Sequence, residues 1–258
     1  MQVTAILEVR KVSKFFGGLA AINNLNLDIF DSEILGLIGP NGAGKTTLFN
    51  IISGFYPLMS GNIIFKKEDI TGLRADQIAK KGISRTFQIS TLFMRATVFE
   101  NVFIGFHLHY KEPGWKAFFH TPAVKREEWV IKQKVEELLD EMGLTPLKDE
   151  LAINLPHGHQ RILGVCIALA CNPKLLLLDE PLTGMNPTEK FAMIALIRKI
   201  RDRGITIVVV EHDVKAVMRA CGRIVVLNHG EKIAEGSPGE IMNNKKVIEA
   251  YIGREEEG

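Results

Sequence analysis

The sequence has few cysteines, almost no excess of charge and no long hydrophobic run. Three cysteines in 258 residues cannot form a disulfide framework, and we expect buried thiols in a reducing compartment. The longest apolar stretches, residues 162–171 and 205–210, fall short of the roughly 18–20 residues that cross a bilayer. The first residues lack the apolar segment of a secretory signal. We therefore expect a soluble cytoplasmic protein, for which a partner supplies any contact with a membrane.

The composition is that of an ordinary globular protein. Hydrophobic residues make up 46% and charged residues 24%, which excludes a disordered or collagen-like chain. The net charge of +2 gives no electrostatic reason to expect nucleic acid as a partner. No internal repeat or low-complexity segment is present, and the length suits one large domain or two small ones.

Strand-like and helix-like segments alternate along most of the chain. Residues 34–38 form an unbroken apolar run, which is typical of a strand buried on both faces. Further strands are expected at 6–10, 25–29, 61–65, 175–178, 205–210 and 224–227, and helices at 47–53, 189–202 and 214–221. This alternation predicts an α/β fold with a mostly parallel sheet. Residues from about 89 to 148, with a periodic helix at 126–142, are expected to form a helical insertion.

A glycine-rich segment between the buried strand and the next helix has the pattern G-x-x-x-x-G-K-[ST]. It comprises Gly39, Pro40, Asn41, Gly42, Ala43, Gly44, Lys45 and Thr46, followed by Thr47. In such a loop the glycines let successive backbone N–H groups converge on a phosphate, and the helix N-terminus adds a positive dipole end. Lys45 would reach the β- and γ-phosphates, and the Thr46 hydroxyl would ligate Mg²⁺. The segment predicts a nucleotide phosphate site.

Two acids follow a second apolar strand, Leu175–Leu178. Asp179 would belong to the Mg²⁺ shell, and Glu180 would act on the attacking water as a general base or orienting group. His212 follows the strand 205–210, where it could hydrogen-bond a γ-phosphate. Gln88, at the start of the helical stretch, could contact the metal or the water; without family knowledge it is only a loop residue.

These segments, in this order, resemble the nucleotide-binding subunit of an ATP-binding cassette (ABC) transporter along essentially the whole chain. The resemblance implies a P-loop ATPase: a single cassette over residues 1–258 with an N-terminal antiparallel β region and a mostly parallel core sheet. Residues 1–88 and about 149–258 would form its core, and about 89–148 its helical subdomain. It further implies that Phe16 stacks on adenine and that Gly184–Asn186 crosses an interface in a head-to-tail dimer. Each ATP would then lie between one chain's phosphate loop and the other chain's signature segment.

The signature departs from the family's usual run, Leu-Ser-Gly-Gly-Gln. The corresponding residues here are Leu155, Pro156, His157, Gly158 and His159. Pro156 lacks both the serine hydroxyl and a backbone N–H, two donors that a γ-phosphate would use. The departure puts the trans contact in question. Compensation by the helix N-terminus that follows is an open alternative.

The long insertion, with residues 106–110 and 113–122, and the C-terminal run 236–253 are similar to the ATPase subunits of branched-chain (hydrophobic) amino acid importers. Urea-type importers and the cassette of lipopolysaccharide export are alternatives, as are a soluble ABC ATPase and a module that no longer hydrolyses ATP. The resemblance implies Mg-ATP as cofactor and a second, different cassette chain as partner. It also implies two membrane permease subunits and a place at the cytoplasmic face of the membrane. A periplasmic or extracellular solute-binding protein would be a partner only indirectly. Residues 97–102 would contribute to the groove for a permease helix, or simply close their own subdomain.

Overall fold

The structure is a computed structural model that describes residues 4–86, 92–106 and 122–252. The chain divides into two compact units, one formed by residues 1–85 and 174–258 and the other by residues 86–173. The second unit therefore extends beyond the insertion expected at about 89–148, because a helix of residues 157–170 contacts the other helices of that unit. Within the described residues, no helix is both long and apolar enough to cross a membrane.

The first unit contains two β-sheets. One is antiparallel, with strands in the order β2 (Leu19–Phe30), β1 (Ala5–Phe16), β4 (Ser60–Phe65) and β5 (Glu68–Asp69). The other has the order β10 (Glu231–Gly236), β9 (Arg223–Asn228), β3 (Ile34–Ile38), β8 (Thr206–Val210), β7 (Leu175–Asp179) and β6 (Ile83–Arg85). All its pairs are parallel except β9 with β10. The predicted antiparallel region and mostly parallel core are both confirmed.

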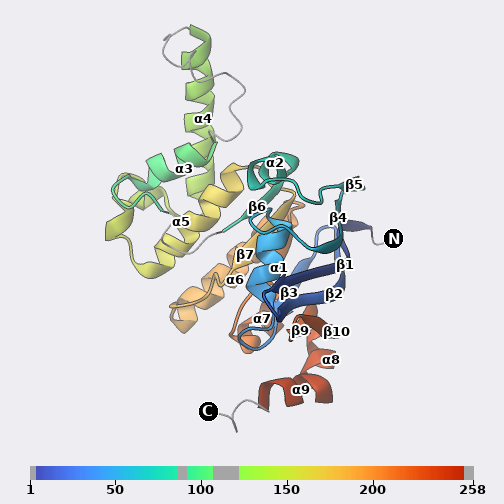
Figure 1. Cartoon of the computed structure of the whole chain (residues 1–258). Helices are drawn as coiled ribbons and strands as arrows, with labels where there is room; N and C mark the ends of the chain where they lie inside the picture. Colours follow the sequence, from blue (N-terminus) through green and yellow to red (C-terminus); the bar gives the residue numbers. More distant parts are fainter. Residues whose placement is uncertain (1–3, 87–91, 107–121, 253–258) are drawn as a thin grey trace. The chain divides into compact units, whose positions relative to one another are not determined.

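Six helices are described in the first unit, where Figure 1 shows α8 and α9 beyond β9 and β10. They are α1 (Lys45–Ile52), α2 (Ala75–Lys81), α6 (Pro187–Asp202), α7 (Val214–Ala220), α8 (Pro238–Met242) and α9 (Lys245–Ile252). One apolar cluster joins buried side chains of both sheets with those of α1, among them Leu48, Phe49 and Ile52. Each such side chain contributes about 1.5–3 kcal/mol on burial. Helix α1 is thereby anchored immediately behind the glycine-rich loop.

The second unit is helical. Its described helices are α3 (Val98–Phe106), α4 (Pro122–Glu141) and α5 (His157–Ala170), with short 3-10 turns at Thr145–Leu147 and Ala152–Asn154. Helix α3 begins with a reciprocal cap: Thr97 N–H donates to Glu100 Oε2 at 2.8 Å, and Glu100 N–H donates to Thr97 Oγ1 at 3.1 Å. The buried Asn101 fixes the preceding turn, because its amide donates to the carbonyls of Phe93 and Thr97.

Candidate active site

The glycine-rich loop connects β3 to α1, as the sequence predicts. All three of its glycines would be strained by replacement: Gly39 has φ 152°, Gly42 has φ 79° and Gly44 has φ 102°, in the region that L-residues rarely adopt. A Cβ on Gly39 would lie 2.1 Å from the Leu227 carbonyl oxygen, and one on Gly44 would lie 2.4 Å from that of Ala21. The neighbouring backbone therefore leaves no room for a side chain at Gly39 or Gly44.

Lys45, the first residue of α1, is buried with its ammonium directed at the loop. Its Nζ donates to the carbonyl oxygens of Gly39 at 2.6 Å and of Pro40 at 2.9 Å. A helix N-terminus and a buried ammonium within one short turn suit a polyanion, because both contribute positive potential at the same place. Thr46 is exposed beside it, where its hydroxyl is available to a ligand. These residues fit the phosphates of a nucleotide.

Asp179, the last residue of β7, forms a buried ion pair with Arg85, the last residue of β6. Arg85 Nη2 lies 2.7 Å from Asp179 Oδ2, and the two side chains are only 7% and 11% exposed. Arg85 Nη1 also donates to Asn50 Oδ1 at 2.5 Å, and the guanidinium lies 5.5 Å from the centre of the Phe49 ring. Sequence reasoning placed Asp179 at the sheet edge but missed Arg85, because no local pattern reveals which strand lies beside β7.

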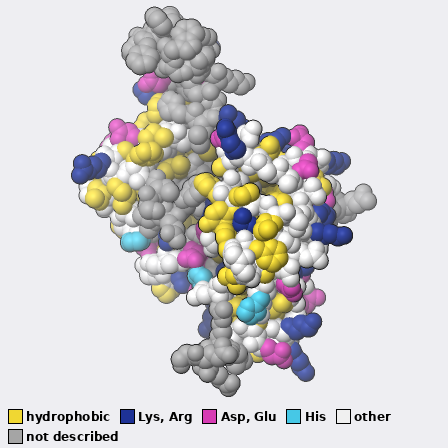
Figure 2. Space-filling view, viewed as in Figure 1, with side chains coloured by type: hydrophobic (Ala, Val, Ile, Leu, Met, Phe, Trp, Pro, Cys, Tyr) yellow, Lys and Arg dark blue, Asp and Glu magenta, His cyan; other side chains and the backbone are white. Residues whose placement is uncertain are grey.

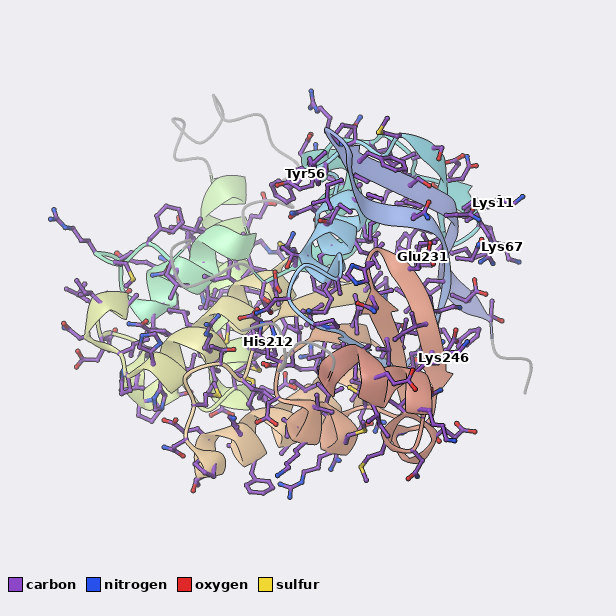
Figure 3. All side chains as sticks on the ribbon, turned by 60° about the horizontal axis from the view of Figure 1, so that its bottom comes forward. Lys11, Tyr56, Lys67, His212, Glu231 and Lys246 are labelled. Carbon is purple, nitrogen blue, oxygen red and sulfur yellow. The ribbon has the colours of Figure 1, made fainter. Side chains whose placement is uncertain are left out.

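Glu180 and His212 meet at the ends of two adjacent strands. His212 Nε2 lies 2.5 Å from Glu180 Oε1, although 32 residues separate them in the chain. Figure 3 shows His212 beyond the end of β8, outside the sheet. Glu180 has φ 50°, a left-handed conformation that costs a non-glycine residue roughly 1–3 kcal/mol. Its N–H donates to the Val210 carbonyl oxygen at 2.9 Å, which ties the strained residue to the strand that precedes His212.

A second acid, Glu211, lies between these segments and was not singled out from the sequence. Its side chain is buried, and its Oε1 accepts a 2.5 Å hydrogen bond from the backbone N–H of Leu182. Its Oε2 accepts from the N–H of His212 at 3.2 Å. Burial raises the pKa of the Glu211 carboxyl above its ordinary value, against the opposing effect of these two hydrogen bonds. A buried acid just before a histidine gives no sequence pattern that separates it from a core residue.

Phe16, the expected adenine platform, ends β1 with an exposed ring. Tyr56 contacts it edge-on, with 5.5 Å between the ring centres and 75° between the ring planes, and Lys14 Nζ lies 5.2 Å from its centre. Leu19 and Phe55 are also exposed. Figure 2 shows hydrophobic side chains reaching the surface on the displayed face of the first unit, with lysine and arginine among them. An exposed aromatic ring such as that of Phe16 can stack against a planar base.

The signature segment forms the start of α5, in the second unit. Pro156 is the N-cap residue with φ −54°, and the Gln160 side-chain amide donates to the carbonyls of Ala152 and Leu155 at 3.2 and 3.1 Å. His157 is exposed, Gly158 is buried and His159 is half-buried. The first N–H groups of any α-helix have no partner within the helix, so this end of α5 offers donors despite the proline. Gln88 lies outside the described residues.

The profile of the ABC transporter family matches residues 22–183, and the profile of the branched-chain amino acid ATP-binding cassette transporters matches residues 231–257. The chain belongs to the ABC transporter ATPases. Its activity is ATP hydrolysis, and the resemblance drawn from its motifs is confirmed.

Close relatives of this ABC ATPase align along nearly the whole chain. It is 41% identical to the high-affinity branched-chain amino acid transport ATP-binding protein BraF of Pseudomonas aeruginosa, covering 96% of this chain and 98% of BraF. It is 40% identical to the corresponding protein LivG of Escherichia coli K12, with the same coverage.

Solved structures of ABC cassettes share its fold. An ADP-bound cassette of an ABC transporter matches with a TM-score of 0.86 at 30% identity, covering 97% of this chain and 99% of that one. A dimeric cassette bound to ADP and phosphate matches with a TM-score of 0.75 at 25% identity, covering 90% and 98%.

Proposed function

We propose that this ABC ATPase energises an importer of branched-chain or other hydrophobic amino acids at the cytoplasmic face of a membrane. The matched C-terminal profile at residues 231–257 and the relatives BraF and LivG support this solute class. The importer would contain a second, different cassette chain, two permease subunits and, indirectly, a solute-binding protein. We expect no nucleic acid among its partners. Co-purification of the chain with its permease subunits, followed by leucine uptake in proteoliposomes, tests the proposal, and uptake of urea alone would contradict it.

The observation that carries the catalytic assignment is the contact between Glu180 and His212. Both side chains stand at the edge of the sheet that carries the phosphate loop, 2.5 Å apart and partly exposed. Glu180 would take a proton from the attacking water, or orient that water, while His212 would donate a hydrogen bond to the γ-phosphate. For His212 to do so, its bond to Glu180 must open when ATP binds.

Residues of the phosphate loop, together with Phe16 and Asp179, would hold the nucleotide and its metal ion. Lys45 would exchange its bonds to the carbonyls of Gly39 and Pro40 for β- and γ-phosphate oxygens. Phe16, on its exposed side, would stack on adenine. A bound Mg²⁺ would neutralise charge on the phosphates, and the Thr46 hydroxyl, the Asp179 carboxylate and Gln88 have the oxygen donors that this ion prefers.

Two variants test these roles. Lys45→Ala should abolish tight ATP binding, because the charge on the β- and γ-oxygens would lose its partner. Glu180→Gln should bind ATP and fail to hydrolyse it, because an amide cannot take the proton. Turnover close to that of the wild type in Glu180→Gln, measured in the assembled complex, would refute the assignment of the base.

We propose that the cassette works as a head-to-tail dimer with one fast and one slow site. A dimeric cassette is among its structural neighbours. ATP on this chain's loop would be covered by a partner's complete signature, whereas ATP on the partner's loop would face Pro156 and Gly158. Gly184–Asn186, where Asn186 accepts from Glu189 N–H as the N-cap of α6, would cross the interface. Pre-steady-state ATP hydrolysis in the assembled heterodimer should show one fast turnover per dimer, and two equal fast turnovers would contradict the proposal.

Permease contact is proposed for residues 97–102 and the exposed side chains beside them. Glu100 caps its own helix, so a charge reversal there would also weaken α3. Ile104, which is 40% exposed on the same helix, is the cleaner probe. Ile104→Asp should lower transport-coupled ATPase while the isolated chain keeps its ATP affinity. Equal loss of both properties would point to misfolding of the second unit.

A further inference from the structure

The turn after β7 is held by two hydrogen bonds from the end of β8. The first joins backbone to backbone, from Glu180 N–H to the Val210 carbonyl oxygen at 2.9 Å. The second joins backbone to side chain, from Leu182 N–H to Glu211 Oε1 at 2.5 Å. Both acceptors belong to adjacent residues, so residues 180–182 are fastened to residues 210–211 at two successive points. Leu182 and Glu211 are almost fully buried, at 1% and 2% exposure, so water does not compete for this second bond.

These two hydrogen bonds stabilise a turn in which the backbone of Glu180 is strained. A non-glycine residue with φ 50° persists only where its surroundings over-determine the backbone. The Val210 carbonyl holds the amide of Glu180 itself. Glu211 holds the turn two residues later, at the N–H of Leu182. The backbone that carries the Glu180 side chain is therefore fixed both at Glu180 and after it.

Glu211 also contacts the other half of the pair. Its Oε2 accepts from the backbone N–H of His212 at 3.2 Å, so one carboxylate bonds to the chain segments of both Glu180 and His212. The charged or titratable side chains that act on it are Glu180 and His212 themselves, and their effects on its ionisation are opposite in sign. Within the described part of the chain the Glu211 carboxylate accepts from the backbone N–H groups of Leu182 and His212, and its burial keeps it from solvent.

We propose that Glu211 is a positioning residue for ATP hydrolysis: its carboxylate fixes the 180–182 turn against residues 211–212, and so holds the backbone segments that carry Glu180 and His212 at a fixed separation. The inference rests on the proposed roles of Glu180 and His212 and adds the group that aligns them. What matters in this role is a hydrogen-bond acceptor at the right reach, rather than a negative charge.

Substitutions of Glu211 separate acceptor, reach and charge. Glu211→Gln keeps one acceptor oxygen at the same reach for the Leu182 N–H and gives up the longer bond from the His212 N–H. Glu211→Asp keeps the charge but shortens the side chain by one methylene, and Glu211→Leu removes both acceptors at similar volume. In the full chain we expect kcat within threefold of the wild type for the glutamine variant. For the leucine and aspartate variants we expect at least a tenfold fall, with KM for ATP within twofold.

Coupling to His212 provides the second readout. In a His212→Ala background, Glu211→Leu should lower the residual kcat by less than twofold, because residues that act through one another are non-additive. Glu33→Leu is the matched control: Glu33 is a partly buried acid of the same unit, 2.6 Å from Arg223. It should lower the melting temperature and leave kcat unchanged. Affinity for a fluorescent ATP analogue should be the same in all the Glu211 variants.

Several results would overturn the inference. One is a kcat within twofold of the wild type in both Glu211→Leu and Glu211→Asp. Another is a multiplicative loss when Glu211→Leu is combined with His212→Ala, because that pattern indicates only a general structural effect. If Glu180→Gln itself retains turnover, the proposed base is wrong and the inference falls with it. If Glu180→Gln is inactive and Glu211→Leu is active, only the inference fails.

Discussion

Removing Arg85 should destabilise the first unit, because it deletes one partner of a buried ion pair with Asp179. The two side chains are 7% and 11% exposed, and the guanidinium Nη2 lies 2.7 Å from the carboxylate. Breaking a buried ion pair by deleting one partner costs about 3–5 kcal/mol, because the remaining charge stays out of water. Arg85→Met keeps much of the side-chain volume over the Phe49 ring, so the charge accounts for most of that loss.

Thermal unfolding followed by circular dichroism measures this effect. For a chain of this size each kcal/mol corresponds to about 2–4 °C, so Arg85→Met should melt roughly 6–20 °C below the wild type. The charge argument also requires recovery: Arg85→Met combined with Asp179→Asn should be more stable than the sum of the single changes, by about 0.5–3 kcal/mol. A loss below about 1 kcal/mol, or strictly additive effects, would refute the reasoning.

Three further expectations follow from burial and from the signature. Pro156→Ser with His157→Gly should raise the ATPase of the isolated chain at least tenfold, since each restored charge-assisted hydrogen bond contributes about 1.5–3 kcal/mol; an unchanged rate would show that the helix end compensates. Because burial raises the pKa of Glu211, the folded chain binds that proton more tightly than the unfolded chain, whose carboxyl titrates near about 4.3, and the contribution to stability falls as pH rises. Melting temperatures should therefore favour Glu211→Gln over the wild type increasingly as the pH rises above the unfolded-state pKa of about 4.3. Burial also raises the pKa of the Cys221 thiol to about 12, and all three cysteines are buried, so Ellman's reagent should find three thiols only after denaturation.

The sequence predicts the parts of the site that depend on local pattern. The apolar runs at 34–38 and 175–178 identify β3 and β7, and the glycine-rich loop and the acids after β7 follow from their spacing. The partnership of Arg85 with Asp179 depends instead on β6 pairing with β7 across about ninety residues of chain. Strand β6 has only three residues, too few for a periodicity to emerge.

The boundary of the helical unit has the same explanation. Helix α5 is recognisable as a buried apolar helix, yet its contacts with α3 and α4 assign it to the second unit. Those contacts come from tertiary packing, and no feature of residues 157–170 alone reveals them. The role of Glu211 is likewise invisible in the sequence, because its partner is a backbone N–H that any residue at position 182 could supply.

The order of the parallel sheet has a consequence for synthesis of the chain. Strand β3 pairs only with β8 and β9 among the described strands, and these begin roughly 170 residues later. At about 5–20 residues per second, a ribosome needs about 10–30 s to make that length. Throughout that interval the apolar strand that leads into the phosphate loop lacks its neighbours in the sheet. We therefore expect chaperones to bind the N-terminal part of the nascent cassette. Chains truncated before residue 228, where β9 ends, should leave that part unfolded.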